Sequence, residues 1–186
     1  YYDPLTNHVV MYEKSQLADV DLQMAIRQAL ATIAHEGVHQ ILHNIGVQQR
    51  LSRWPIWISE GLPEYFAPTD VGKRLRWKGV GQTNDMRMSE LEDYFKDKSR
   101  DTPWGETIEK TVGAQRLTST GYASAWALVH FLAKKREDQF FAYVQEVSKL
   151  GPMEGRPRIG EEPIDNMILF KKHFGEDLEE MEKLEV

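Results

Sequence analysis

Apolar residues recur at helical spacing along most of the chain, and this pattern predicts a mainly helical protein. The longest such stretch runs from about residue 20 to residue 44 without a proline. Its apolar positions are Leu22, Ile26, Leu30, Ile33, Ile41 and Ile45. Asp19 or Asp21 is a suitable N-cap for this helix, and Gly46 lies where a glycine commonly follows a helix. Residues 7–12 predict one short strand.

A second helix is expected to start near Ser59 and to end near Ala67, because Pro63 is tolerated only in the first turn of a helix. Residues 68–87 are rich in glycine and charged residues, which predicts an irregular segment with room for a hairpin. Further helices are expected at residues 89–96, 107–111, 120–135, 138–150, 164–174 and 176–183. A loop at 151–163 and a hinge at Gly175 separate the last of them.

Together these elements predict an α+β domain that is predominantly helical. Residues 1–70 would form a lobe with a small sheet edge and the longest helix, and residues 71–186 would form a helical lobe that closes a cleft against it. The chain opens with Tyr1 rather than with methionine, so we expect a fragment or processed form whose upstream part is missing.

Composition excludes several classes of site. The formal net charge of −6, with scattered lysines and arginines, argues against a nucleic-acid partner. The absence of cysteine excludes disulfides, thiolate metal sites and cysteine nucleophiles. No apolar run approaches the ~20 residues that a membrane-spanning helix needs, so no span is expected in this fragment.

The segment His35-Glu36-Gly37-Val38-His39 matches H-E-x-x-H within the longest predicted helix. Residues i and i+4 share one helix face, so both imidazoles can reach one ion, and imidazole suits zinc. Glu36 is one position further on, where it can take a proton from metal-bound water. The pattern therefore predicts a catalytic metal site.

A catalytic zinc ion needs a third protein ligand besides water. The extended motif with a third histidine is excluded, because Leu42 and Ile45 stand where it needs glycine and histidine. Glu60 instead follows on the next predicted helix, and Glu64 lies one turn beyond it. We expect Glu60 to bind the metal and Glu64 to accept the outer N–H of a ligating histidine, most simply His35. A solvent-facing Glu64 is the alternative.

The pairing of Ala-His-Glu-Gly-Val-His at 34–39 with Trp-Ile-Ser-Glu-Gly-Leu-Pro-Glu-Tyr-Phe at 57–66 resembles the gluzincin metallopeptidases. It is most similar to small bacterial domains of the peptidase-MA-like group, and the opening Tyr-Tyr-Asp-Pro segment is similar to theirs. The resemblance implies a zincin-like fold, Zn²⁺ and hydrolysis of peptide bonds in a peptide or protein substrate. It also favours an extracytoplasmic or secreted location. Pro63 replaces the usual alanine, and the G-x-M-E-N signature of M1-type aminopeptidases is missing.

The family resemblance also implies an oxyanion-binding side chain on the second lobe, and Tyr122 resembles the tyrosine found there. Tyr12 and Tyr65 are the alternatives. We expect His43 to be a structural or surface residue and His130 to be a core histidine with its polar atoms satisfied, whereas His8 would line the cleft if its strand borders it. An extended substrate could then pair with that strand.

Two rival functions remain open from the sequence. The first is a catalytically inactive zincin-like module that binds a peptide or protein, against which the intact Glu36 argues. The second is a helical domain with a coincidental motif, against which Glu60 and Glu64 argue. Metal content separates the helical domain with a coincidental motif from the other two readings. Turnover separates the peptidase from the inactive module. The pattern specifies neither the substrate sequence nor the oligomeric state.

Overall fold

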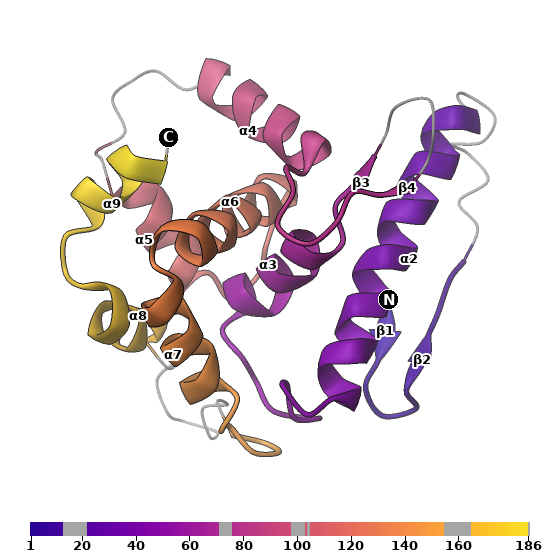
Figure 1. Cartoon of the computed structure of the whole chain (residues 1–186), viewed down its shortest axis with the longest axis horizontal. Helices are drawn as coiled ribbons and strands as arrows, with labels where there is room; N and C mark the ends of the chain where they lie inside the picture. Colours follow the sequence, from indigo (N-terminus) through magenta and orange to yellow (C-terminus); the bar gives the residue numbers. More distant parts are fainter. Residues whose placement is uncertain (13–21, 71–75, 98–102, 104, 155–164, 186) are drawn as a thin grey trace.

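The computed structural model describes residues 1–12, 22–70, 76–97, 103, 105–154 and 165–185 (Figure 1). Over these residues the protein is predominantly helical with two small sheets, which confirms the predicted α+β class. The helices are α2 (Leu22–Asn44), α3 (Ile56–Phe66), α4 (Asp85–Asp97), α5 (Glu106–Gly113), α6 (Ser119–Lys135), α7 (Glu137–Val147), α8 (Asn166–Phe174) and α9 (Leu178–Glu185). The strands are β1 (Tyr2–Asp3), β2 (His8–Val9), β3 (Thr69–Asp70) and β4 (Arg76–Trp77).

The first sheet is an antiparallel hairpin that lies along α2. Tyr2 pairs with Val9 and Asp3 pairs with His8, and Asn7 takes a left-handed φ of 60° in the turn between the strands. The strand predicted over residues 7–12 is therefore too long. Strand pairing is limited to the two residues of β1. Beyond it, Tyr1 and Val10 exchange two hydrogen bonds: the Val10 amide donates to the Tyr1 carbonyl, and the Tyr1 amino group donates to the Val10 carbonyl.

Helix α2 ends at Asn44, and Gly46 follows with a φ of +79°, as the sequence predicts. The candidate N-caps Asp19 and Asp21 lie outside the described residues. The apolar side chains that predict this helix form a stripe that faces solvent, with exposed fractions of 38–66%. The opposite face, which carries His35, His39 and the buried Leu42, packs toward α3.

Helix α3 begins at Ile56, three residues before the predicted start, so the prediction that Pro63 lies in its first turn is wrong. Pro55 precedes the helix, and its carbonyl accepts the amides of Ile58 and Ser59. Pro63 therefore lies in the helix interior, where it has no N–H to donate to the carbonyl of Ser59. The helix continues past this missing bond because its buried residues pack against α6.

The segment predicted to be irregular contains a β3–β4 hairpin and the first turn of α4. Helix α4 starts four residues before its predicted start, because Asn84 caps it: the Asn84 side-chain oxygen accepts the Arg87 amide at 3.3 Å. Helices α5 to α9 follow the predicted order; α6 and α8 end where predicted, and the other ends are displaced by one to three residues. Most of the predicted loop at 151–163 lies outside the described residues.

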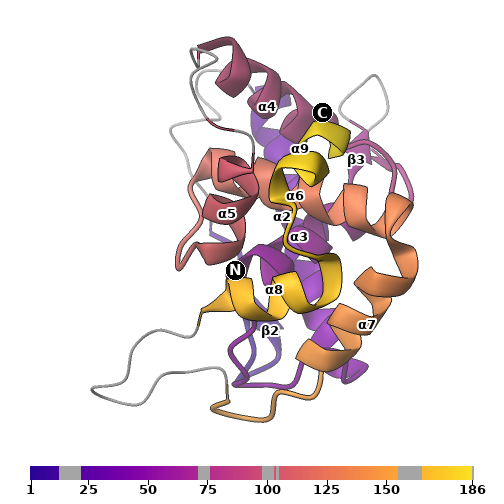
Figure 2. The ribbon, with the colours of Figure 1, turned by 90° about the vertical axis from the view of Figure 1, so that its left-hand side faces the viewer.

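One buried hydrophobic cluster contains residues of both predicted lobes. Figure 2 shows α8 and α9 on the near side of the molecule, in front of α3. Trp57 and Ile58 of α3 contribute to the cluster together with Leu128 and Leu132 of α6, and Phe170 of α8 extends it. The closest approach is at Gly61 of α3, where an added Cβ would lie 2.7 Å from the Ala125 carbonyl and from Val129. The helix that carries Glu60 is therefore fixed against α6.

No helix in the described part of the chain is long and apolar enough to cross a membrane.

Candidate metal centre

Two histidines of α2 and one glutamate of α3 converge on one point. Nε2 of His35 lies 3.1 Å from Oε2 of Glu60 and 3.2 Å from Nε2 of His39. The third edge of this triangle, from His39 Nε2 to Glu60 Oε2, is 3.5 Å. The three side chains are only 12–18% exposed. Among the described residues this is the cluster of histidines and acids that could hold a metal ion.

The triangle fits a tetrahedral metal ion. Bonds of about 2.0–2.2 Å at tetrahedral angles place neighbouring ligand atoms about 3.3–3.6 Å apart, close to the measured edges. The donor chemistry agrees, because Nδ1 of His35 already faces a carboxylate of Glu64 at 3.0 Å. When Nδ1–H is donated to Glu64, a neutral His35 carries no proton on Nε2. The Nε2 lone pair would then face the Glu60 oxygen, and the two atoms would repel each other. A cation between the two atoms removes this repulsion.

A proton can serve as that cation in the metal-free protein. Burial by itself lowers the pKa of His35, but hydrogen bonds to Glu60 and Glu64 outweigh it and raise the pKa to about 9. Burial raises the pKa of Glu60, yet hydrogen bonds from His35 and His39 lower it to about 2. A metal ion would therefore displace a proton as it binds.

Glu64 is buried and holds the outer side of the His35 ring. Its side chain is 7% exposed, so the solvent-facing alternative is wrong. Oε1 lies 3.0 Å from Nδ1 of His35 and also accepts Nη2 of Arg87 at 2.7 Å. Oε2 accepts the side-chain amide of Asn84 at 2.9 Å. Burial raises the pKa of Glu64, but the hydrogen bonds from His35 and Arg87 lower it to about 2.

Glu36 lies on the side of α2 that faces the β1–β2 hairpin. Its Oε2 accepts a 2.7 Å hydrogen bond from the backbone amide of Tyr2. The Tyr2 ring is buried against His43, with ring centroids 5.2 Å apart. Gln40 of α2 also donates to the Asn7 carbonyl in the hairpin turn. The Glu36 carboxylate, next in sequence to the candidate ligand His35, is therefore held in place by main chain.

Tyr122 of α6 is brought to the same site, with its ring centroid 6.2 Å from that of His35. Burial, followed by the charge of Glu60, raises the pKa of its hydroxyl to about 12. The two alternative tyrosines lie elsewhere. Tyr12 is 69% exposed, and the hydroxyl of Tyr65 lies against Gly81.

The remaining candidate histidines lie outside the triangle. His43 packs on Tyr2, and burial lowers its pKa. His130 packs between Trp126 and Tyr65, and burial lowers its pKa as well. His8 is exposed on β2.

A family model for proteins of unknown function, DUF1570, matches residues 29–154. The chain belongs to the DUF1570 family. The matched span contains every residue of the centre described above except Tyr2, so the convergence of α2, α3, α4 and α6 lies within the DUF1570 region. No curated protein and no solved structure matches the chain.

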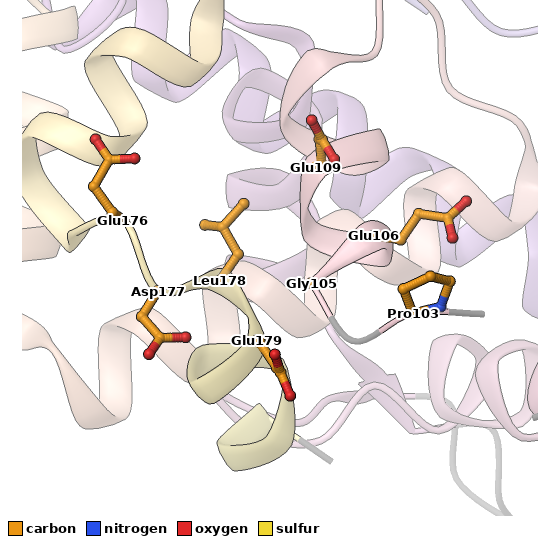
Figure 3. A pocket seen from close by; sticks show the side chains of 8 residues that line it. All are labelled: Pro103, Gly105, Glu106, Glu109, Glu176, Asp177, Leu178 and Glu179. Carbon is orange, nitrogen blue, oxygen red and sulfur yellow. The ribbon is translucent and has the colours of Figure 1, made fainter. Parts of the chain in front are cut away.

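A hollow of about 700 Å³ in this DUF1570 member is separate from the candidate metal centre (Figure 3). It lies between α5 and the start of α9, and acidic side chains surround it: Glu106, Glu109, Glu176, Asp177 and Glu179. Acidic groups on the surface are commonly solvated, and Lys110 and Lys171 form ion pairs with two of these residues. The histidine cluster therefore remains the candidate metal centre of the described residues.

Sequence reasoning missed the groups that reach the centre from distant parts of the chain. Arg87 lies 23 residues from Glu64 in the sequence, and Asn84 lies 20 residues from it. The Tyr2 amide reaches Glu36 across 34 residues. Asn84 does carry a local signal as a helix cap. Nothing in the sequence connects Arg87 to Glu64.

Proposed function

We propose that this DUF1570 protein is a zinc-dependent metallopeptidase of the gluzincin type with a zincin-like fold. The observation that carries the proposal is the triangle of His35 Nε2, His39 Nε2 and Glu60 Oε2, with Glu36 next to it on α2. Two imidazoles and one carboxylate, with a carboxylate base beside them, are the donor set of a catalytic zinc site. A zinc ion held there supplies a Lewis acid that acidifies water and polarises a carbonyl group.

The side chains of this protein would divide the remaining work. Glu36 takes a proton from the attacking water and later delivers it to the leaving amine. Tyr122, with a pKa of about 12, keeps its proton at neutral pH and donates a hydrogen bond to the developing oxyanion. Glu64 accepts the Nδ1–H of His35 and so fixes the ring that binds the metal.

One contact favours the rival reading of an inactive module that binds a peptide or protein. The Tyr2 amide occupies Oε2 of Glu36, so the proposed base already serves as an acceptor in the resting chain. Hydrolysis requires Glu36 to exchange this partner for water, whereas a binding module does not.

The test has two steps. The chain is stripped of metal and reloaded, and bound zinc is counted; one equivalent is expected, and none would leave only the coincidental motif. The zinc-loaded protein is then incubated with a peptide library and the products are identified by mass spectrometry. Cleavage that a chelator abolishes and zinc restores supports the peptidase. Binding of peptides without any cleavage supports the inactive module.

A further inference from the structure

Glu64 is held from two sides. On one side it accepts Nδ1–H of His35, and on the other side α4 supplies two donors, Nη2 of Arg87 at 2.7 Å and Nδ2 of Asn84 at 2.9 Å. The His35 and Arg87 bonds share Oε1, while Asn84 takes Oε2. Both carboxylate oxygens are thus fixed by residues at the start of α4.

Arg87 also reaches α6. Its guanidinium carbon lies 5.3 Å from the centroid of the Tyr122 ring, at the distance of a cation–π contact. Its Nη1 donates to Glu90 at 2.8 Å, and Glu90 in turn accepts the hydroxyl of Ser119 at 3.0 Å. With a side chain only 13% exposed, Arg87 connects the residue behind His35 with the ring of Tyr122.

Asn84 has two functions at the same place. Its side-chain oxygen caps α4 by accepting the Arg87 amide, and its side-chain nitrogen donates to Glu64. The residue is only 6% exposed. The position of the first turn of α4 therefore fixes the orientation of the Glu64 carboxylate.

We propose that Arg87 and Asn84 are positioning residues of the metal centre: both orient Glu64, and through it the His35 ring, while Arg87 also holds the Tyr122 ring. This inference rests on the proposed function, because it assumes that His35 binds a metal. Arginine suits the role because its rigid planar fork reaches two carboxylates and a ring face at once, which a lysine ammonium cannot do.

The test compares four variants in the full chain. Arg87→Met removes the fork, and Arg87→Lys keeps only the charge. Asn84→Ser keeps a capping oxygen but loses the donor to Glu64. Lys78→Met is the matched control, since Lys78 forms an ion pair with Asp85 at the start of α4 without touching Glu64. Zinc affinity is measured by chelator competition, the visible spectrum is recorded with Co²⁺ in place of zinc, and thermal unfolding is followed in the metal-free state.

Arg87→Met and Asn84→Ser should weaken zinc binding by about 10–100-fold and shift the Co²⁺ absorption bands, as expected when the partner of a ligating histidine is disturbed. Arg87→Lys should recover only part of the affinity, and Lys78→Met should bind like the wild type. A purely structural role would lower the unfolding temperature while affinity and the Co²⁺ spectrum stay unchanged.

Two results would overturn this inference and leave the proposed function intact. One is unchanged zinc affinity and an unchanged Co²⁺ spectrum in Arg87→Met and Asn84→Ser. The other is an equal loss of zinc affinity in Lys78→Met. If Arg87→Met does not fold, Asn84→Ser decides. Wild-type protein that takes up no metal at His35, His39 and Glu60 overturns the proposed function and this inference together.

Discussion

The backbone amide of Tyr2 donates a 2.7 Å hydrogen bond to Oε2 of Glu36. The proposed catalytic base is therefore also one of the residues of α2 that hold the β1–β2 hairpin. A substitution at this position changes two properties, hairpin docking and proton transfer. The two can be separated, because docking needs only a hydrogen-bond acceptor whereas proton transfer needs a basic oxygen.

Glu36→Gln should keep the fold and one equivalent of zinc while peptide hydrolysis falls to near background. The amide oxygen of glutamine still accepts the Tyr2 N–H, but it does not take up a proton at neutral pH. Zinc content, thermal unfolding and turnover of a peptide substrate are measured on the same preparation. Glu36→Ala serves as the comparison, since it loses the acceptor as well and should also unfold at a lower temperature. Wild-type turnover in Glu36→Gln would show that Glu36 is not the base.

His35→Ala, His39→Ala and Glu60→Ala should each lose stoichiometric zinc, because each removes one corner of the triangle. Metal content after dialysis against a limiting chelator measures the effect. His43→Ala is the matched control: it lies on the same helix but packs on Tyr2, so it should retain zinc. Three ligand variants that all retain one equivalent would refute the assignment.

Glu64→Gln should lower zinc affinity by about 10–100-fold, because glutamine accepts the His35 N–H without a negative charge. It should also lower the free energy of unfolding by about 1.5–3 kcal/mol, since Arg87 loses a charged hydrogen-bond partner in a buried setting. Chelator competition and urea unfolding give the two quantities. Loss of stability without loss of affinity would limit Glu64 to a structural role.

Gly61→Ala should displace α3 from α6, because its Cβ would lie 2.7 Å from the backbone oxygen of Ala125. We expect a loss of about 1–3 kcal/mol in the free energy of unfolding, as for other overpacked sites, and weaker zinc binding since Glu60 is the preceding residue. Gly37→Ala is the control. A Cβ there meets nothing within 4 Å, and alanine should stabilise α2 by up to about 1 kcal/mol. Equal effects of the two substitutions would contradict the packing argument.

The stability of the metal-free protein should fall as pH rises from about 6.5 to about 9. The pKa of His35 is raised from 6.5 to about 9 in the folded chain. A raised pKa stabilises the fold below the unfolded value, and this contribution is lost as pH rises through the folded value. Thermal unfolding over this pH range measures the effect. His35→Gln should lack this part of the pH dependence, and an unchanged slope in that variant would assign it to other groups.

The candidate ligands could be picked out from the sequence because helix geometry places each pair on one face, although only the packing of α2 against α3 brings the two pairs together. His35 and His39 share a face of α2 once that segment is helical, and Glu60 and Glu64 share a face of α3 whether the helix starts at Ile56 or at Ser59. The predicted start of α3 is wrong because Pro63 removes only one backbone hydrogen bond, and the packing of α3 on α6 outweighs that loss.

The surroundings of the ligands could not be predicted, because they depend on tertiary contacts. Arg87 has no sequence relation to Glu64, and only the placement of α4 brings them together. The Tyr2 amide is a backbone group, which any residue type other than proline would supply. Side-chain patterns therefore indicate where the chemistry lies but not what orients it.

The solvent-facing stripe of α2 has a practical consequence for the purified chain. Six aliphatic side chains lie exposed along α2 and just past its end: Leu22, Ile26, Leu30, Ile33, Ile41 and Ile45. Contiguous apolar surface promotes self-association and adsorption even when the net charge is −6. We therefore expect this face to favour self-association of the purified chain, most strongly when sulfate or other excluded salts are added.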